Sequence, residues 1–171
     1  MIKKIKNNVW QLHFNKFGSC VYLIKLNNKN ILIDTSTYQN EQELIKDLKE
    51  LDASPEKINT LIITHNHFDH VENMSLFENA EIYANKIEFP DDKIKNINNL
   101  NINELKIIHT PGHSKGSFCI LYNNILFSGD TIFHNNGVGR TDLEGGSYEK
   151  LLNSIEKLSK INYEILCPGH V

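Results

Sequence analysis

The sequence predicts a sheet-rich α/β fold of stacked layers, in one domain that spans residues 1–171. Three observations support this prediction. Short apolar runs of strand length recur along the chain, two segments with apolar residues at the helical period lie among them, and no repeat or linker-like stretch interrupts the 171 residues. With 40% hydrophobic and 23% charged residues, the composition is that of a globular protein and not of a disordered tail.

The first 34 residues are predicted to form strands. Residues 9–14 alternate apolar and polar side chains, and residues 20–26 are rich in β-forming side chains. A polar turn at residues 27–30 then leads to the apolar residues 31–33. The N-terminal part is therefore expected to contribute neighbouring strands to one sheet.

Two helices are predicted from apolar residues that recur at a period of about 3.6. The first covers residues 41–52 and the second covers residues 147–159. Their apolar faces consist of Leu44, Ile45, Leu48 and Leu51, and of Leu151, Leu152, Ile155 and Leu158, respectively. After the first helix, Ser54 and Pro55 predict a cap and the first residue of a short helical turn.

From position 61 onward the chain repeats one arrangement, an apolar run followed by a polar cluster that carries His or Asp. The four runs are Leu61–Ile63, Leu105–Ile108, Ile125–Phe127 and Ile165–Cys167. Each has the length of a buried strand, and sites in layered α/β proteins form where several strands end together. The four polar clusters are therefore expected to converge on one centre.

The densest cluster is His65-Asn66-His67-Phe68-Asp69-His70. Residues two apart at the end of a strand point the same way, so His65 and His67 are predicted to bind one ion together. Asp69 and His70 follow where the chain turns, and they can face a second ion. Imidazole and carboxylate are the ligands of catalytic zinc, which keeps one position open for water. The cluster therefore predicts a metal centre.

Three further motifs follow this cluster along the chain. They are Pro111-Gly112-His113, Ser128-Gly129-Asp130-Thr131 and Pro168-Gly169-His170. In this order, the cluster and the motifs resemble the H-x-H-x-D-H, lone His, bridging Asp and last His of the metallo-β-lactamase-fold superfamily. The resemblance covers nearly the whole chain, and it implies a four-layer αββα sandwich of two mixed β-sheets with outer helices.

The resemblance also implies two divalent metal ions, zinc in the first place, with iron or manganese as the other candidates. The first ion would be bound by His65, His67 and His113. The second would be bound by Asp69, His70 and His170, and Asp130 would bridge the two ions. The charges agree with this assignment, because two carboxylates and a shared hydroxide offset most of the charge of two divalent cations.

Within the superfamily, residues 128–131 and 139–143 are most similar to the glyoxalase II-like (hydroxyacylglutathione hydrolase-like) branch. This implies a hydrolase in which hydroxide attacks a thioester or ester of a small acyl compound, because a bound metal lowers the pKa of water to about 7. Asp69 and Asp130 would be the catalytic carboxylates, with Asp69 orienting the hydroxide. The chain matches a short form without the C-terminal helical domain, so glutathione specificity is not expected, and weaker binding of the second ion is expected near the chain end.

An oxidoreductase on the same fold is the main alternative. Persulfide dioxygenases hold a single iron at the positions of His65, His113 and Asp130, and all three residues are present. A nuclease is disfavoured because no long insertion separates His70 from His170, and a lactamase is disfavoured because lactamases lack the aspartate at position 130. A metal-binding domain with little catalysis of its own is the least specific alternative.

A serine hydrolase is a further alternative. Residues 112–116 match G-x-S-x-G with Ser114 as the nucleophile, and Asp130 and His170 follow in the order of α/β-hydrolases. That fold requires a helix directly after the serine, whereas residues 117–122 have the pattern of a strand. The histidine cluster would also be left without a role.

The charge pattern disfavours a nucleic-acid partner. The net charge is −3, and the only arginine is Arg140. Arg140 is expected to pair with a carboxylate such as Asp142 and so to fix its loop, rather than to contact substrate. Lys115 is expected to face solvent. The expected partner is a small-molecule substrate.

A cytoplasmic location is expected, without membrane association. No apolar run approaches the ~18 residues of a membrane span, and the basic N-terminus has no apolar stretch behind it that would indicate a secretory leader. The three cysteines, Cys20, Cys119 and Cys167, lie far apart within apolar runs, and are expected to be buried, reduced thiols.

Three histidines lie outside the motifs. His13 and His109 are expected to be strand residues, and His134 is expected near the mouth of the site because it follows Asp130 closely.

Overall fold

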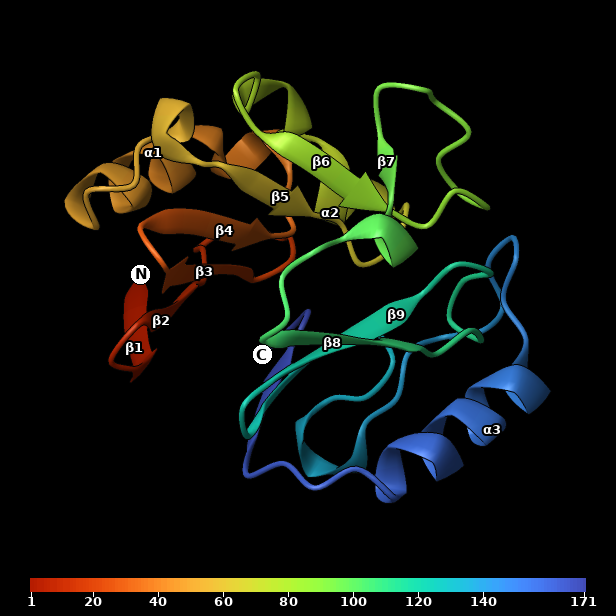
Figure 1. The fold of residues 1–171 in the computed structure, drawn as a ribbon. Helices are drawn as coiled ribbons and strands as arrows, with labels where there is room; N and C mark the ends of the chain where they lie inside the picture. The colour runs from red at the N-terminus through yellow and green to blue at the C-terminus, as the bar shows by residue number, and fades with distance from the viewer.

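The computed structural model describes residues 1–171 as two mixed β-sheets packed face to face, with helices on their outer sides (Figure 1). Helix α1 lies outside the first sheet and helix α3 outside the second. This arrangement confirms the αββα sandwich that the motif series implies.

The first sheet has seven strands in the order of the sequence. They are β1 (Ile2–Lys6), β2 (Val9–Leu12), β3 (Val21–Leu26), β4 (Lys29–Ile33), β5 (Thr60–Ile62), β6 (Glu81–Ala84) and β7 (Lys95–Asn96). Strands β1 to β4 form an antiparallel meander, and β4 to β7 are parallel. Parallel neighbours require crossovers, and helix α1 (Glu41–Glu50) provides the one between β4 and β5.

The second sheet has the strand order β11-β10-β9-β8. Its strands are β8 (Leu105–His109), β9 (Phe118–Tyr122), β10 (Ile125–Gly129) and β11 (Ile165–Pro168). Because β9 is antiparallel to both β8 and β10, and β11 is parallel to β10, the strands β8, β10 and β11 end at the same edge of the sheet. Helix α3 (Tyr148–Ser159) connects β10 to β11, and its N-cap Ser147 accepts a hydrogen bond from the backbone N–H of Lys150.

Three apolar clusters hold the layers together. The largest lies between the sheets and includes Tyr22, Phe118 and Phe127. Leu44 and Leu48 of α1 pack on the outer face of the first sheet, and Leu158 of α3 packs on the outer face of the second. These buried residues belong to the apolar faces predicted from the helical period, whereas the prediction for Leu152 is wrong, since this residue of α3 is 47% exposed.

Most of the predicted elements are present, with shifted ends. Helix α1 ends at Glu50 and not at residue 52, because Asp52 has a left-handed backbone with φ of +50°. The prediction of a strand residue at His13 is wrong, since the pairing of β2 with its neighbours stops at Leu12. His109 is the last residue of β8, as predicted.

Short elements account for the remaining differences. Strands β6 and β7 and the one-turn helix α2 (Phe68–Val71) lie where the sequence pattern predicts neither strand nor helix. Five 3₁₀ turns complete the chain: Tyr38–Asn40, Pro55–Lys57, Met74–Leu76, Ile97–Asn99 and His134–Asn136. The second of these is the turn that Ser54 and Pro55 predict.

No helix has both the length and the apolar character that crossing a bilayer requires.

Candidate metal centre

The predicted site residues come together at the edge where strands of both sheets end. His65 and His67 lie in the loop after β5, and Asp69 and His70 lie on α2. The other three come from the second sheet: His113 from the β8–β9 loop, Asp130 from the residue after β10, and His170 from the second residue after β11. The four polar clusters therefore converge in the structure, as expected.

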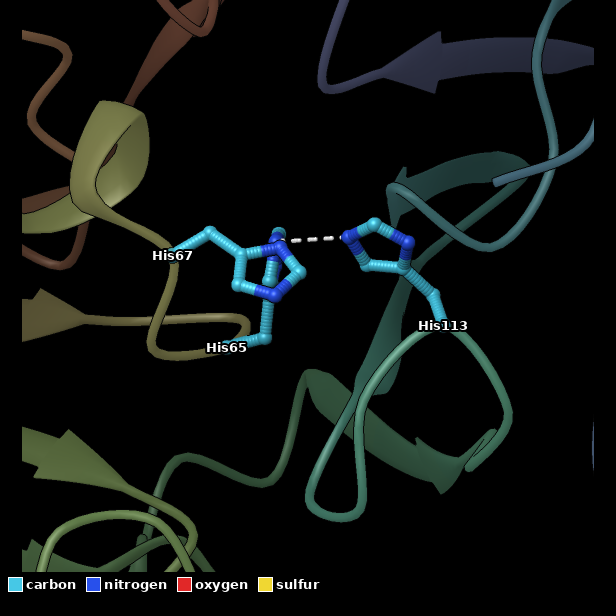
Figure 2. Close-up of side chains that lie close together, drawn as sticks. All are labelled: His65, His67 and His113. Atoms are coloured by element: carbon cyan, nitrogen blue, oxygen red, sulfur yellow. Dashed lines mark hydrogen bonds between the residues drawn. The ribbon is translucent and has the colours of Figure 1, made fainter. Parts of the chain in front are cut away.

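The first donor group consists of three imidazoles. One ring nitrogen of each of His65, His67 and His113 lies within 4.8 Å of the others. Figure 2 shows the three rings close together, on two separate loops. Nε2 of His65 lies 3.2 Å from Nε2 of His113. Two imidazoles on one tetrahedral zinc have their nitrogens about 3.3 Å apart, given Zn–N distances of about 2.0–2.1 Å. The spacing is that of a shared ion.

The second donor group consists of Asp69, His70 and His170, whose donor atoms also lie within 4.8 Å of one another. Oδ2 of Asp69 is 3.1 Å from Nε2 of His170 and 4.0 Å from Nε2 of His70. His70 is fully buried, whereas the side chain of His170 is 29% exposed. This group therefore reaches from the interior to the surface.

Asp130 lies between the two groups. Its Oδ2 is 3.6 Å from Nε2 of His113 in the first group and 3.4 Å from Nε2 of His170 in the second. Its Oδ1 is 3.3 Å from Nε2 of His70. One carboxylate thus faces both groups, which is the placement that a bridging ligand needs.

Hydrogen bonds on the far side of three rings direct their Nε2 atoms into the site. Nδ1 of His113 lies 2.8 Å from the carbonyl oxygen of Arg140, which only accepts, so this nitrogen carries the proton. Nδ1 of His65 lies 3.1 Å from Oγ1 of Thr64, and Nδ1 of His70 lies 2.8 Å from Oδ2 of Asp34. Such outer partners set the tautomer of histidines that bind metals.

Asp34 is a functional residue that the sequence interpretation missed. Its carboxylate accepts hydrogen bonds from the backbone N–H of Thr64, from the Thr64 hydroxyl and from Nδ1 of His70, each at 2.8 Å. Because the Thr64 hydroxyl proton points to Asp34, its oxygen can only accept from His65, so Asp34 also sets the tautomer of His65. The sequence contains a sign of this role, since Asp34 directly follows an apolar run, as the other polar clusters do.

The electrostatics of the site leave His65 neutral and Asp130 ionised, and they favour a proton on His70 that a bound cation would displace. Burial lowers the pKa of His65 well below its usual value, so this ring is neutral and offers a lone pair. Burial opposes the charges of His70 and Asp130, but neighbouring charged groups outweigh burial at both. Asp34 and Asp130 raise the pKa of His70, and His70 and His170 lower the pKa of Asp130. The carboxylate of Asp130 is therefore ionised.

The residues fit a cation. Nε2 of His70 and Oδ1 of Asp130 are buried and have no hydrogen-bond partner, although they lie 3.3 Å apart. Leaving a buried polar atom unpaired costs about 1–3 kcal/mol. The Nε2 lone pairs of His65 and His113 also face each other, which is repulsive unless a cation lies between them. Borderline nitrogen and oxygen donors of this kind suit zinc or iron.

Two glycines allow the backbone to approach Asp130 closely. A Cβ atom on Gly139 would lie 1.9 Å from the carbonyl oxygen of Asp130, and one on Gly169 would lie 2.1 Å from its Oδ1. Gly139 therefore lies where the backbone packs against the carbonyl oxygen of Asp130, and Gly169 where it packs against the Asp130 carboxylate.

The remaining predicted residues have other roles. Arg140 and Asp142 form a two-bond ion pair at 2.8 and 2.7 Å, as predicted. Ser114 is hydrogen-bonded to Ser117 at 2.5 Å, and strand β9 follows, so the serine-hydrolase geometry is absent. His134 is exposed in a hollow beside α3 and belongs to neither donor group. The three cysteines are buried and unpaired.

Two surfaces border the donor groups. A hollow of about 460 Å³ opens beside His67, and its walls include Ile87, Leu143 and the exposed Lys115. On the side of His170, Phe17 and Phe68 are 65% and 58% exposed, with ring centroids 6.0 Å apart. The ring of Phe17 is stacked on that of His170 at 5.9 Å. The two surfaces therefore flank the donor groups on different sides.

Comparison with known proteins identifies relatives over most of the chain. Residues 15–88 and 95–170 match the family model of the metallo-beta-lactamase superfamily. A probable metallo-hydrolase of Methanocaldococcus jannaschii, MJ0296, is 37% identical over 143 residues, which are 82% of this chain and 70% of that protein. A hydroxyacylglutathione hydrolase of Francisella tularensis subsp. novicida is 32% identical over 120 residues, which are 64% of this chain and 47% of that protein.

A solved structure supports the same fold. The crystal structure of TTHA1623 in a di-iron-bound form superimposes with a TM-score of 0.81 at 21% identity, and covers 94% of this chain and 91% of that one. At this identity the likeness concerns the fold. The hydroxyacylglutathione hydrolase is about twice as long as the part that the chain matches, so the two proteins share one region and not their whole length.

Proposed function

The chain belongs to the metallo-β-lactamase superfamily, and on this premise we propose that it is a metal-dependent hydrolase of thioesters or esters of small acyl compounds, similar to glyoxalase II. The observation that carries the proposal is the position of Asp130 Oδ2, 3.6 Å from the first donor group and 3.4 Å from the second. Two donor groups that share one carboxylate provide for a pair of ions.

We assign the pair of ions to seven side chains. His65, His67 and His113 would hold one ion, Asp69, His70 and His170 the other, and Asp130 both. Zinc is proposed as the metal, because imidazole and carboxylate are its usual ligands in hydrolases. When bound, such ions lower the pKa of water to about 7 and stabilise the negative charge that develops on an attacked carbonyl oxygen.

The chain's own residues then orient the reactants. The pKa of Asp69 is lowered because its hydrogen bond with His170 and the charge of His70 outweigh burial, so its carboxylate is ionised and can accept a hydrogen bond from the attacking water. Asp130 keeps the two groups at a fixed separation. His67 is half-buried and borders the hollow, which gives the carbonyl group of a substrate access to the first donor group.

The two bordering surfaces support this substrate class. The exposed rings of Phe17 and Phe68 offer an apolar surface to an acyl chain. Lys115 on the hollow has no carboxylate within 4.0 Å, so its ammonium can meet a polar leaving group. A small-molecule acyl thioester or ester has both parts.

The second donor group favours this proposal over the oxidoreductase alternative. A single iron would need only His65, His113 and Asp130, and would leave Asp69, His70 and His170 gathered without a role. Two ions per chain are therefore expected.

Metal analysis combined with a substrate panel tests the proposal. We expect about two zinc ions per chain, and hydrolysis of acyl thioesters or esters that a chelator abolishes and added zinc restores. Protein that carries two zinc ions but splits no thioester, ester or lactone would contradict the hydrolase. One iron per chain together with oxygen uptake would establish the oxidoreductase instead.

A further inference from the structure

Glu88 connects two loops that carry metal-centre histidines. It lies in the turn after β6, outside both donor groups. Its Oε2 accepts a hydrogen bond from the backbone N–H of Asn66 at 2.9 Å, and its Oε1 accepts one from the backbone N–H of Gly116 at 2.7 Å. Asn66 separates His65 from His67, and Gly116 belongs to the loop of His113. One carboxylate therefore joins the loops from opposite sheets.

We propose that Glu88 is a positioning residue, which holds the His65–His67 loop against the His113 loop and so sets the spacing of the first donor group. The inference rests on the proposed role of these three histidines as metal ligands. The distance that Glu88 would set is the 3.2 Å between Nε2 of His65 and Nε2 of His113, because each nitrogen belongs to one of the two loops.

The turn that carries Glu88 is built to hold it in place. The backbone N–H groups of Glu88 and Phe89 both donate to the carbonyl oxygen of Asn85, at 3.0 and 3.1 Å, and Phe89 is buried in the core beside the first sheet. The Asn85 side chain also donates to the carbonyl oxygen of Gly116 at 3.0 Å. The peptide groups of Gly116 are thus held from both sides by one turn.

The Asn66 side is held in the same way. Besides the bond from its backbone N–H, the Asn66 side chain donates to the carbonyl oxygen of Glu88 at 3.2 Å. Position 116 must be glycine for the carboxylate to fit, since a Cβ atom there would lie 2.9 Å from Cγ and Cδ of Glu88. The carboxylate therefore lies in a close-fitting place between the two loops.

A carboxylate is the group that this arrangement requires. Two backbone N–H groups approach two different oxygens, and both oxygens of an ionised glutamate accept. In Glu88→Gln one of these oxygens becomes an NH₂ group, which cannot accept from the N–H it faces, so one bond is lost and a donor is left facing a donor. An isosteric variant therefore separates the positioning role from simple packing.

The folded chain does not depend on Glu88 alone. The backbone N–H of Phe118 also donates to the carbonyl oxygen of Thr64 at 3.4 Å, and the sheets share their large apolar core. The variants are therefore expected to fold, with the loss confined to the two loops.

The test compares Glu88→Gln and Glu88→Ala with the control Glu144→Gln. Glu144 is an exposed glutamate on the same hollow that makes no hydrogen bond to either loop, so its variant removes the same charge without the contacts. Two readouts are measured: hydrogen exchange of the Asn66 and Gly116 amides in the metal-free protein, and the Zn²⁺ affinities of the two ions by competition with a chelator.

We expect both Glu88 variants to speed exchange of the two amides at least tenfold and to weaken one of the two Zn²⁺ affinities by about 10–100-fold, the usual effect of removing an outer partner of a metal ligand. The other affinity and the control should remain at wild-type values. Wild-type amide protection and affinity in Glu88→Gln would overturn the inference. If the wild-type protein binds no Zn²⁺, the proposed function fails, and amide exchange alone then decides whether Glu88 joins the loops.

Discussion

Nε2 of His65 and Nε2 of His113 lie 3.2 Å apart, and neither carries a proton when its ring is neutral. The proton of His113 is on Nδ1, bonded to a backbone carbonyl, and that of His65 is on Nδ1, bonded to Thr64. Two lone pairs directed at one point repel each other unless a cation accepts both. The tautomers of these two histidines therefore indicate a cation site, as the distance between their nitrogens does.

Removal of metal should lower stability as well as activity. Without a cation, the Nε2 lone pairs of neutral His65 and His113 face each other uncompensated. A ligand that binds only the folded state stabilises it by about 2.7 kcal/mol at 100 times its Kd, which corresponds to roughly 5–10 °C in Tm for a chain of this size. Thermal unfolding of chelated protein, with and without added Zn²⁺, measures this shift.

The control for this experiment is Mg²⁺, which prefers oxygen ligands and should leave the Tm of the chelated protein unchanged. An equal Tm with and without Zn²⁺ would mean that the seven side chains do not bind a metal in the folded state.

Replacement of Asp34 should weaken metal binding although Asp34 touches no ion. In Asp34→Asn, an NH₂ group replaces one carboxylate oxygen, and the three donors from Thr64 and His70 can no longer all be accepted. His65 and His70 then lose the partners that set their tautomers, so Zn²⁺ affinity should fall by about 10–100-fold. Chelator competition measures the loss.

Asp92→Asn serves as the matched variant, because Asp92 is exposed and belongs to neither donor group. Unchanged affinity in Asp34→Asn would show that the network behind the histidines has no influence on the metal.

Metal binding at the second donor group should strengthen as the pH rises. Burial opposes the charge of His170, but hydrogen bonds with Asp130 and Asp69 outweigh it and raise its pKa to about 9 in the metal-free protein. Below this pKa the ring holds a proton that the ion must displace. The affinity should therefore rise by at least tenfold per pH unit between neutral pH and about 9, because His70 of the same donor group also has a raised pKa.

Isothermal titration with Zn²⁺ in buffers of different ionisation enthalpy counts the protons released on binding. At neutral pH we expect at least one proton for the second ion. Binding without proton release would mean that His170 is neutral before the metal arrives, and would contradict the ion pairs with Asp69 and Asp130.

Much of this candidate site can be predicted from the sequence because its residues follow apolar runs in short, dense motifs. His65, His67, Asp69 and His70 lie within six positions, and an apolar run precedes each of the later candidate ligands. The prediction that His65 and His67 lie at a strand end is wrong, since β5 stops at Ile62 and both residues lie in the following loop. Their rings still converge, with centroids 4.7 Å apart, because the loop turns back toward the second sheet.

The elements and residues that escaped prediction depend on contacts between distant parts of the chain. Strand β7 has two residues and exists only through its pairing with β6. Glu88 looks like an ordinary loop charge, and its partners Asn66 and Gly116 are remote in sequence. No local pattern identifies a carboxylate whose two hydrogen-bond donors come from two other loops.

The exposed aromatic pair should select for apolar acyl groups. Phe68→Ala removes a ring that is 58% exposed beside Phe17, which is stacked on His170, so an acyl chain that packs on it loses apolar contact. A loss on the order of 1 kcal/mol corresponds to roughly fivefold in kcat/KM for a long acyl thioester, and an acetyl thioester should be unaffected. Steady-state kinetics on a series of acyl chain lengths measures the difference.

Tyr148→Ala is the control for this series, because Tyr148 is 63% exposed on α3 and belongs to neither donor group. A uniform loss for all chain lengths in Phe68→Ala would indicate disturbance of the neighbouring Asp69 instead of lost acyl contact.

A methyl group at position 139 should damage the bridge between the two ions. In Gly139→Ala the new Cβ atom would lie 1.9 Å from the carbonyl oxygen of Asp130 and 3.0 Å from Nδ1 of His113, so the backbone must shift. Overpacking of this kind costs about 1–3 kcal/mol of unfolding free energy, and the shift moves Asp130 relative to both donor groups. Gly137→Ala is the matched variant, because its Cβ would approach only Phe133 and a carbonyl group, at 3.2 and 3.3 Å. Chemical denaturation and metal content of both variants measure the effect, and Gly139→Ala protein with two tightly bound ions would show that the close approach to Asp130 is not required.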